Sequence, residues 1–284
     1  MRHRPRKERR LLQVLQTQKP SGALRAVVRT YAQRDVEASD AAFRQVGPAR
    51  LEPTLEFQFH GAFDVRRPDG LVNAAPSLVV VGGYSEPVEL ISRGRIQTFA
   101  VFFQPTGFSR LFGIGNRELF NRFHDAHAVL GSQIEALRCQ LAETESFDKR
   151  ARITDAFLCK QLSRARRAES MWQIADHMFE EKGVLRMHDV AYLQGMGMRQ
   201  FERTFQQQIG TTPKQFARIA RFTSALDAKA ASPHRPWLYI AHTFGYYDQM
   251  HMVRDFHELA GCAPGTMLAN IGDSRPPSQL LVSV

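Results

Sequence analysis

The spacing of apolar residues differs between the two halves of this chain. Between about Leu55 and Phe103 they form short runs rich in Val, Phe and Ile, separated by Gly, Pro, Asp and Asn. Such runs with turn residues between them are typical of an antiparallel β unit. The run from Ser77 to Gly83 does not alternate with polar residues, which predicts a strand buried on both faces. This part is therefore predicted to be a small sandwich or barrel.

Apolar residues three and four positions apart, as in amphipathic helices, lie on either side of this β unit. A short helix is predicted over residues 11–17, and another segment at helical spacing contains Leu24, Val27, Val28 and Tyr31. After the β unit, helices are predicted at 108–112, 117–120, 132–142 and 146–162. A helix at 171–179 then begins an all-helical part, with Met171, Ile174, Ala175 and Met178 as its apolar stripe.

Two later stretches each predict a helix, a Gly-containing turn and a second helix. They run from Val190 to Pro213 and from Ile240 to Pro264, and a long helix over 216–229 joins them. Their landmarks repeat: Gly195 matches Gly245 at an offset of 50, while Arg203, Phe205, Gly210 and Pro213 match Arg254, Phe256, Gly261 and Pro264 at 51. One such helix pair is common in soluble proteins, but two matching copies indicate a repeated helix-turn-helix.

The second helix of each copy has an apolar face and a polar face. The residues predicted to be buried are Met198, Phe201, Phe205 and Ile209 in the first copy, and Met252, Phe256 and Leu259 or Ala260 in the second. The residues predicted to face outward are Arg199, Glu202, Arg203 and Gln206, and Gln249, Met250, His251 and Arg254. Such side chains suit the major groove of DNA, where Arg bonds guanine, Glu accepts from cytosine, Gln suits adenine and Met can contact the thymine methyl group.

Residues 168–268 resemble the C-terminal DNA-binding domain of the AraC/XylS transcription regulators. The matching residues are Ala191, Gly195, Arg203, Phe205, Gly210, Pro213 and Arg221 in the first copy, and Ile240, Ala241, Gly245, Tyr246, Asp248, Gln249, Arg254, Phe256, Gly261 and Pro264 in the second. The resemblance implies base-reading roles for Arg199, Glu202, Arg203, Gln249, Met250, His251 and Arg254. Gly197 stands where the family often has a Ser that caps the recognition helix, which weakens that cap by a few tenths of a kcal/mol.

The N-terminal half resembles the β-rich domain of uncharacterised function found in one subgroup of these regulators. The segments PDGLVNAAPSLVVVGG and VFFQPTGFSRLFGI carry this resemblance, although Gly115 replaces a Pro that the subgroup often has. The family resemblance implies double-stranded promoter or operator DNA as the partner. It also makes RNA polymerase, an unknown small-molecule effector and a second copy of the chain expected partners, and it implies no cofactor.

Length and charge agree with a regulator of this kind. The chain has 284 residues, which is enough for two domains, and a formal net charge of +10. Residues 2–10 hold six Arg or Lys and one Glu, so the rest carries about +5. Basic excess favours a polyanion such as DNA, because cationic side chains release its condensed counterions. The predicted fold is α+β, divided into a basic disordered tail (1–17), a β-rich regulatory or dimerisation domain (18–162), a linker (163–167), the double helix-turn-helix domain (168–268) and a C-terminal tail (269–284).

Competing interpretations have less support in the sequence. Candidate metal ligands are His251, Asp255 and His257 on one helix, His124 and His127 in a predicted loop, and His60 in a strand without an HxH partner. The three Cys residues show no CxxC spacing, and no phosphate-binding, nucleophile-elbow or dinucleotide motif occurs. We therefore expect a non-enzyme without a bound metal. No apolar run is long enough for a membrane span and no signal peptide is recognised, so a cytoplasmic, nucleoid-associated protein is expected. The serious alternative is a helical protein-interaction module that uses the same faces.

Overall fold

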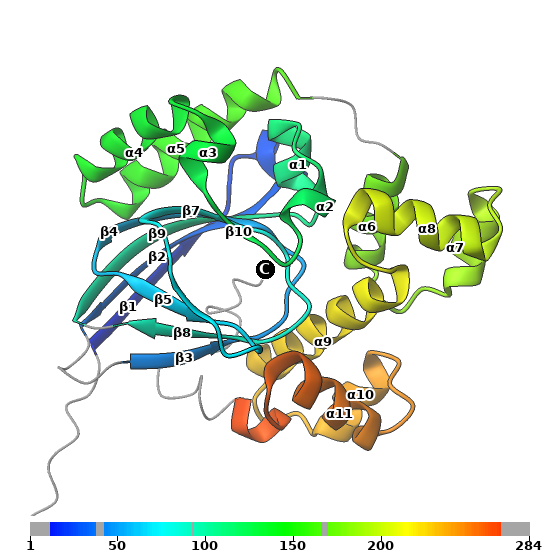
Figure 1. Cartoon of the computed structure of the whole chain (residues 1–284). Coiled ribbons are helices and arrows are strands. Elements are labelled where there is room, and N and C mark those ends of the chain that lie inside the picture. The colour runs from blue at the N-terminus through cyan, green and yellow to red at the C-terminus, as the bar shows by residue number, and fades with distance from the viewer. Residues whose placement is uncertain (1–11, 38–42, 93, 166–169, 268–284) are drawn as a thin grey trace, which may run out of the picture.

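Two antiparallel β-sheets face each other in the N-terminal part of the protein (Figure 1). The computed structural model describes residues 12–37, 43–92, 94–165 and 170–267. Within these residues the strands are β1 (Leu12–Gln18), β2 (Val28–Glu37), β3 (Phe43–Gly47), β4 (Thr54–His60), β5 (Phe63–Arg66), β6 (Val72–Ala74), β7 (Leu78–Val81), β8 (Val88–Ser92), β9 (Arg95–Phe103) and β10 (Phe123–Asp125), and a short 3-10 helix, η1, spans Gly22–Leu24. One sheet has the order β1-β2-β9-β4-β7-β10 and the other the order β3-β8-β5-β6.

The larger sheet is buried on both faces at its centre. Its outer face is covered by α1 (Gly107–Phe112), α3 (Ala126–Leu130), α4 (Gln133–Ala142) and α5 (Phe147–Leu162), while α2 (Asn116–Leu119) lies at the end of the barrel beside α8. Phe99 of β9 lies in this core, where its ring contacts those of Tyr31, Phe57 and Phe147 at centroid distances of 6.1, 6.3 and 6.2 Å. Because the inner face lines the barrel and the outer face lies under helices, β7 is buried at all four positions.

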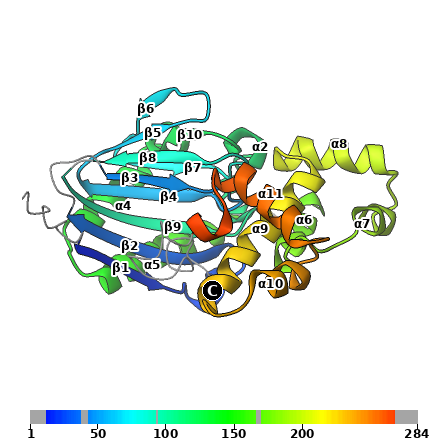
Figure 2. The same cartoon turned by 90° about the horizontal axis from the view of Figure 1, so that it is seen from below.

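The C-terminal part is entirely helical. Its helices are α6 (Ser170–Glu180), α7 (Met187–Leu193), α8 (Met198–Ile209), α9 (Pro213–Ala231), α10 (Trp237–Thr243) and α11 (Gln249–Ala260). The long α9 runs between the α7–α8 and α10–α11 pairs and passes the end of the barrel (Figure 1 and Figure 2). None of the described helices is long and apolar enough to cross a bilayer.

Polar contacts join the two parts of the chain. Arg29 of β2 pairs with Glu52 and, at 3.4 Å, with Asp227 of α9. Asp176 of α6 accepts hydrogen bonds from the backbone N–H of Thr106 (3.3 Å) and from its hydroxyl (2.6 Å). Ala49 and Leu51 of the N-terminal part are also buried in the C-terminal core.

The structure confirms the predicted fold class and corrects several of its details. The β unit, the short helices at 108–112 and 117–120, and the longer ones at 132–142, 146–162 and 171–179 are present within one or two residues. The helix predicted at 11–17 is wrong: β1 begins at Leu12 and pairs with β2 along its length, so residues 12–17 belong to the sheet rather than to a tail. The helical segment predicted from Leu24 to Tyr31 is also wrong, because β2 pairs with the central strand β9.

The loop predicted around His124 and His127 is likewise corrected. His124 lies in β10, which pairs with β7. His127 lies in the first turn of α3, and its backbone N–H donates to the side chain of Asp125, which caps the helix. The basic segment 2–10, residues 166 and 167 of the predicted linker and the C-terminal tail lie outside the described residues.

Candidate nucleic-acid interface

The two predicted helix pairs adopt the same local geometry. α7 and α8 are joined through Gly195 (φ +64°), and α10 and α11 through Gly245 (φ +68°). α8 and α11 then end at Gly210 (φ +91°) and Gly261 (φ +70°). These left-handed conformations strain any residue with a Cβ, so Gly is required in the turn and at the end of each pair. The repeat of glycines in the sequence is therefore a repeat in backbone conformation.

The connecting helix α9 holds both second helices through aromatic contacts. The rings of Phe205 in α8 and Phe216 in α9 meet edge to face at 5.6 Å, and those of Phe256 in α11 and Phe222 in α9 meet at 4.7 Å. Such pairs contribute about 0.5–1.5 kcal/mol beyond their area burial. Each second helix thus packs its apolar face on the same rigid support.

The residues predicted to face outward do so, with one exception. Arg199, Glu202, Arg203 and Gln206 are exposed on α8, and Gln249, Met250 and Arg254 are exposed on α11. His251 is half-buried, with its ring edge-on to that of Tyr246 at 5.5 Å. Within the described residues, the hydrogen bonds and ion pairs include none from the side chains of Arg199, Glu202, Arg203 or Arg254. These charged groups are therefore available to an external partner.

The sequence and the fold both have counterparts among known proteins. Residues 191–270 match the sequence profile of a family described as a helix-turn-helix domain. This profile is of the AraC type. The chain carries an AraC-type helix-turn-helix domain. The presence of this domain supports a DNA-binding transcription regulator.

Solved structures similar to the whole chain support the same fold. The crystal structure of ToxT from Vibrio cholerae O395 has a TM-score of 0.51 at 11% identity, and the match covers 91% of this chain and 98% of that one. ToxT from the same strain bound to (E)-4-(8-methylnaphthalen-1-yl)but-3-enoic acid has a TM-score of 0.50 at 11% identity, covering 93% and 100%. At such identity the likeness concerns the fold alone. No curated protein matches this sequence.

The two recognition-helix candidates of the AraC-type domain begin differently. Asp248 caps α11 by accepting a hydrogen bond from the N–H of His251 at 2.6 Å. Gly197 precedes α8 and provides no side-chain cap, as its residue type predicts. The first turn of α8 therefore lacks the side-chain hydrogen bond that stabilises the first turn of α11.

A buried ion pair that sequence reasoning missed fixes the back of α11. Asp255 is 2% exposed, and its Oδ1 accepts from Nε of Arg218 in α9 at 2.6 Å. Asp255 also acts on a neighbour: burial, together with the negative charge of Asp255, raises the pKa of the Tyr246 hydroxyl. The Asp255 carboxylate is buried and paired with Arg218. This pairing argues against a metal site in which Asp255 would join His251 and His257 as a ligand. The sequence carried no signal for this pair, because its members lie on helices 37 residues apart.

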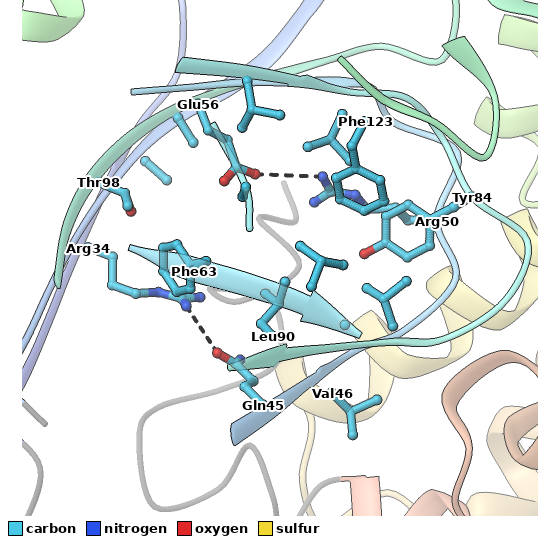
Figure 3. A pocket seen from close by; sticks show the side chains of 18 of the residues that line it. Arg34, Gln45, Val46, Arg50, Glu56, Phe63, Tyr84, Leu90, Thr98 and Phe123 are labelled. Atoms are coloured by element: carbon cyan, nitrogen blue, oxygen red, sulfur yellow. Dashed lines mark hydrogen bonds and ion pairs between the residues drawn. The ribbon is translucent and has the colours of Figure 1, made fainter. Parts of the chain in front are cut away.

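The barrel also encloses a cavity of about 130 Å³, lined mainly by apolar side chains (Figure 3). Its charged lining residues are Arg34, Arg50 and Glu56. Nη2 of Arg50 donates to Thr54 at 2.8 Å and lies 4.0 Å from Oε1 of Glu56, while the buried Nε has no hydrogen-bond partner. Arg34 donates to the side chain of Gln45 at 3.0 Å, and burial lowers its pKa. The lining therefore has one positive charge in excess.

Proposed function

We propose that this regulator reads a bipartite DNA site with α8 and α11, each placed in its own major groove. The observation that carries the proposal is the exposed, unpaired polar face repeated on both second helices of the AraC-type domain. Successive major grooves on one face of B-DNA are about 34–36 Å apart, so two readers on one rigid chain favour one long site over two separate ones.

The proposed base contacts follow from the chemistry of each face. Arg199, Arg203 and Arg254 supply forked donors suited to guanine O6 and N7, and Glu202 supplies an acceptor suited to cytosine N4. Gln206 and Gln249 suit adenine, Met250 suits the thymine methyl group, and the half-buried His251 contributes a ring nitrogen at the groove edge. The Gly197 start of α8 would leave that helix more adaptable than the capped α11.

Substitution of the arginines tests this reading. A DNA site is first selected from a random pool with the full chain, and affinities are then measured for Arg203→Ala and Arg254→Ala. Each variant should weaken binding by about 1–3 kcal/mol because a good bidentate base contact is lost. Arg152→Ala, which removes the same charge from an exposed position of α5, is the matched control. Unchanged affinity in both recognition-helix variants would exclude the proposed contacts.

Salt dependence separates DNA reading from the alternative of a protein-interaction module. Binding to DNA should weaken steeply with added salt, with a log–log slope of about 0.9 per neutralised phosphate. A response to salt that is flat would favour a protein partner for the same faces.

We also propose that the barrel senses a small organic acid. The cavity of about 130 Å³ compares with the roughly 150 Å³ of a cavity that holds benzene, so the ligand has about one ring. The excess positive charge of the lining favours a carboxylate on that ring. ToxT, which shares the fold, has been crystallised with a larger aromatic carboxylic acid.

Thermal unfolding with matched ligands tests the sensing proposal. Single-ring carboxylic acids such as benzoate should raise Tm, whereas their neutral amides should not, because the amide leaves the cationic lining uncompensated. Arg50→Met should remove the difference between acid and amide. Equal shifts with acids and amides would contradict a site for anions.

A further inference from the structure

The turn of the second helix pair contains one residue that the turn of the first pair lacks. In both turns the residue after the Gly donates its backbone N–H to the carbonyl oxygen five positions earlier, at 3.0 Å for Met196 and at 2.9 Å for Tyr246. The next residue in the first pair, Gly197, is already the N-cap of α8. In the second pair Tyr247 comes before the N-cap Asp248. Tyr247 is therefore the inserted residue.

The neighbours Tyr246 and Tyr247 lie in opposite environments. Tyr246 is 3% exposed and belongs to the hydrophobic core of the AraC-type domain. Tyr247 is 88% exposed, more than any other large apolar residue in the described part of the chain. Among the hydrogen bonds and ring contacts of the described residues, none involves the Tyr247 side chain. The fold therefore makes no use of this ring.

Tyr247 adjoins the end of α11 that is placed to read DNA. The N-terminal residues of a recognition helix are the ones that contact base edges in the major groove. At this end the side chain of Asp248 accepts a hydrogen bond from the N–H of His251 at 2.6 Å, which holds the start of the helix. The exposed ring of Tyr247 thus projects from a firmly held turn beside the first bases that α11 would meet.

A second exposed apolar side chain lies three residues further on. Met250 is 60% exposed in the first turn of α11. At an offset of 51 residues, the corresponding position of α8 is Arg199. The leading end of α11 therefore presents apolar surface where that of α8 presents charge. Burial of apolar surface is favourable, and the apolar group that the major groove offers is the C5 methyl of thymine.

We propose that Tyr247 is a specificity-determining residue, whose ring packs with Met250 against thymine methyl groups at the leading end of α11. This inference rests on the proposed function, in which α11 reads one half of the DNA site. It adds that this half contains thymine where α11 enters the groove. The ring rather than the hydroxyl makes the contact, which distinguishes it from a hydrogen bond between Tyr and a phosphate.

Replacement of thymine by uracil tests this contact, because it removes only the C5 methyl group. The half-site of α11 is identified as the half of the selected site at which Arg254→Ala loses contacts, and each of its thymines is replaced in turn. For the full chain, at least one replacement should weaken binding about fourfold, which corresponds to one buried methyl group. Tyr247→Ala should bind the unmodified site more weakly by at least that factor, and should no longer distinguish thymine from uracil at that position.

Two further variants control for the hydroxyl and for a general loss of aromatic surface. Tyr247→Phe keeps the ring and should respond to uracil as the full chain does. Tyr192→Ala removes a 77% exposed ring from α7 in the first pair and should leave the uracil response in the half-site of α11 unchanged. Because the Tyr247 ring makes no contacts within the fold, Tyr247→Ala should also unfold at the same urea concentration as the full chain.

The possible results separate this inference from the proposed function. A uracil response that persists in Tyr247→Ala, or no uracil response anywhere in the half-site of α11, overturns the inference and leaves two-part recognition intact. Equal losses in Tyr247→Phe and Tyr247→Ala would overturn it in favour of a phosphate contact through the hydroxyl. Failure of the full chain to select any DNA sequence would refute the proposed function, and the inference with it.

Discussion

Asp176 at the junction of the two domains gives a quantitative test of the structure through pH. Its side chain is 21% exposed and lies 3.8 Å from Nη1 of Arg110. Burial raises its pKa from 3.8 to about 6, although the hydrogen bonds from Thr106 and the charge of Arg110 oppose that rise. The ionised carboxylate is therefore less stable in the folded protein than in the unfolded chain.

The sign of the pH dependence follows from linkage. Between pH 3.8 and about 6 the folded state binds more protons at Asp176 than the unfolded state, so this group adds stability as pH falls through that range. Above pH 6 the ionised group opposes folding by an upper limit of about 3 kcal/mol. Partial contact with solvent reduces this, and we expect about 1–2 kcal/mol.

Asp176→Asn should therefore stabilise the protein by about 1–2 kcal/mol at pH 7.5, because the amide oxygen still accepts from Thr106 without a buried charge. At pH 4.5 the folded carboxyl is protonated but most of the unfolded carboxyl is still ionised, so the gain should be smaller than at pH 7.5, and it should vanish only below pH 3.8. Urea unfolding at both pH values measures this, with Asp189→Asn as a control at an exposed position of α7. Destabilisation at pH 7.5, or the same difference at both pH values, would refute the reasoning.

Three further substitutions test the AraC-type domain by chemical denaturation. Arg218→Met leaves the buried Asp255 without its cation and should lower the free energy of unfolding by about 3 kcal/mol. Adding Asp255→Asn should restore a large part of that loss. A negligible loss in Arg218→Met would show that the ion pair does not hold α11 in place. Gly197→Ser should stabilise the protein by a few tenths of a kcal/mol through a new cap on α8, and a loss of stability would contradict that cap geometry. Gly210→Ala should cost more than about 1 kcal/mol, because φ is +91° and the new Cβ would meet Phe120; neutrality would contradict the tight contact.

The helical half was predictable from local signals. The turns need Gly at 195 and 245 for their left-handed backbone, and the spacing of Phe201 and Phe205 marks the buried face of α8, so sequence and structure are tied within a few residues. The exposed face of α8 follows from the same period.

The errors occurred where long-range pairing overrides local spacing. Leu24, Val27, Val28 and Tyr31 have helical spacing, yet β2 pairs with β9 about 70 residues away, and that pairing decides the conformation. β1 was missed for the same reason, since its strand state depends on β2. The docking of Ala49 in the C-terminal core had no signal at all, because a small apolar residue in a connecting segment looks like any other.

We expect α8 and α11 of one chain to read two halves of one DNA site. The most direct test is base-by-base interference mapping on the selected site with the full chain, Arg203→Ala and Arg254→Ala. The full chain should protect two elements about one helical turn apart, Arg203→Ala should lose contacts in one element, and Arg254→Ala should lose contacts in the other. A single continuous element that both variants weaken equally would contradict it.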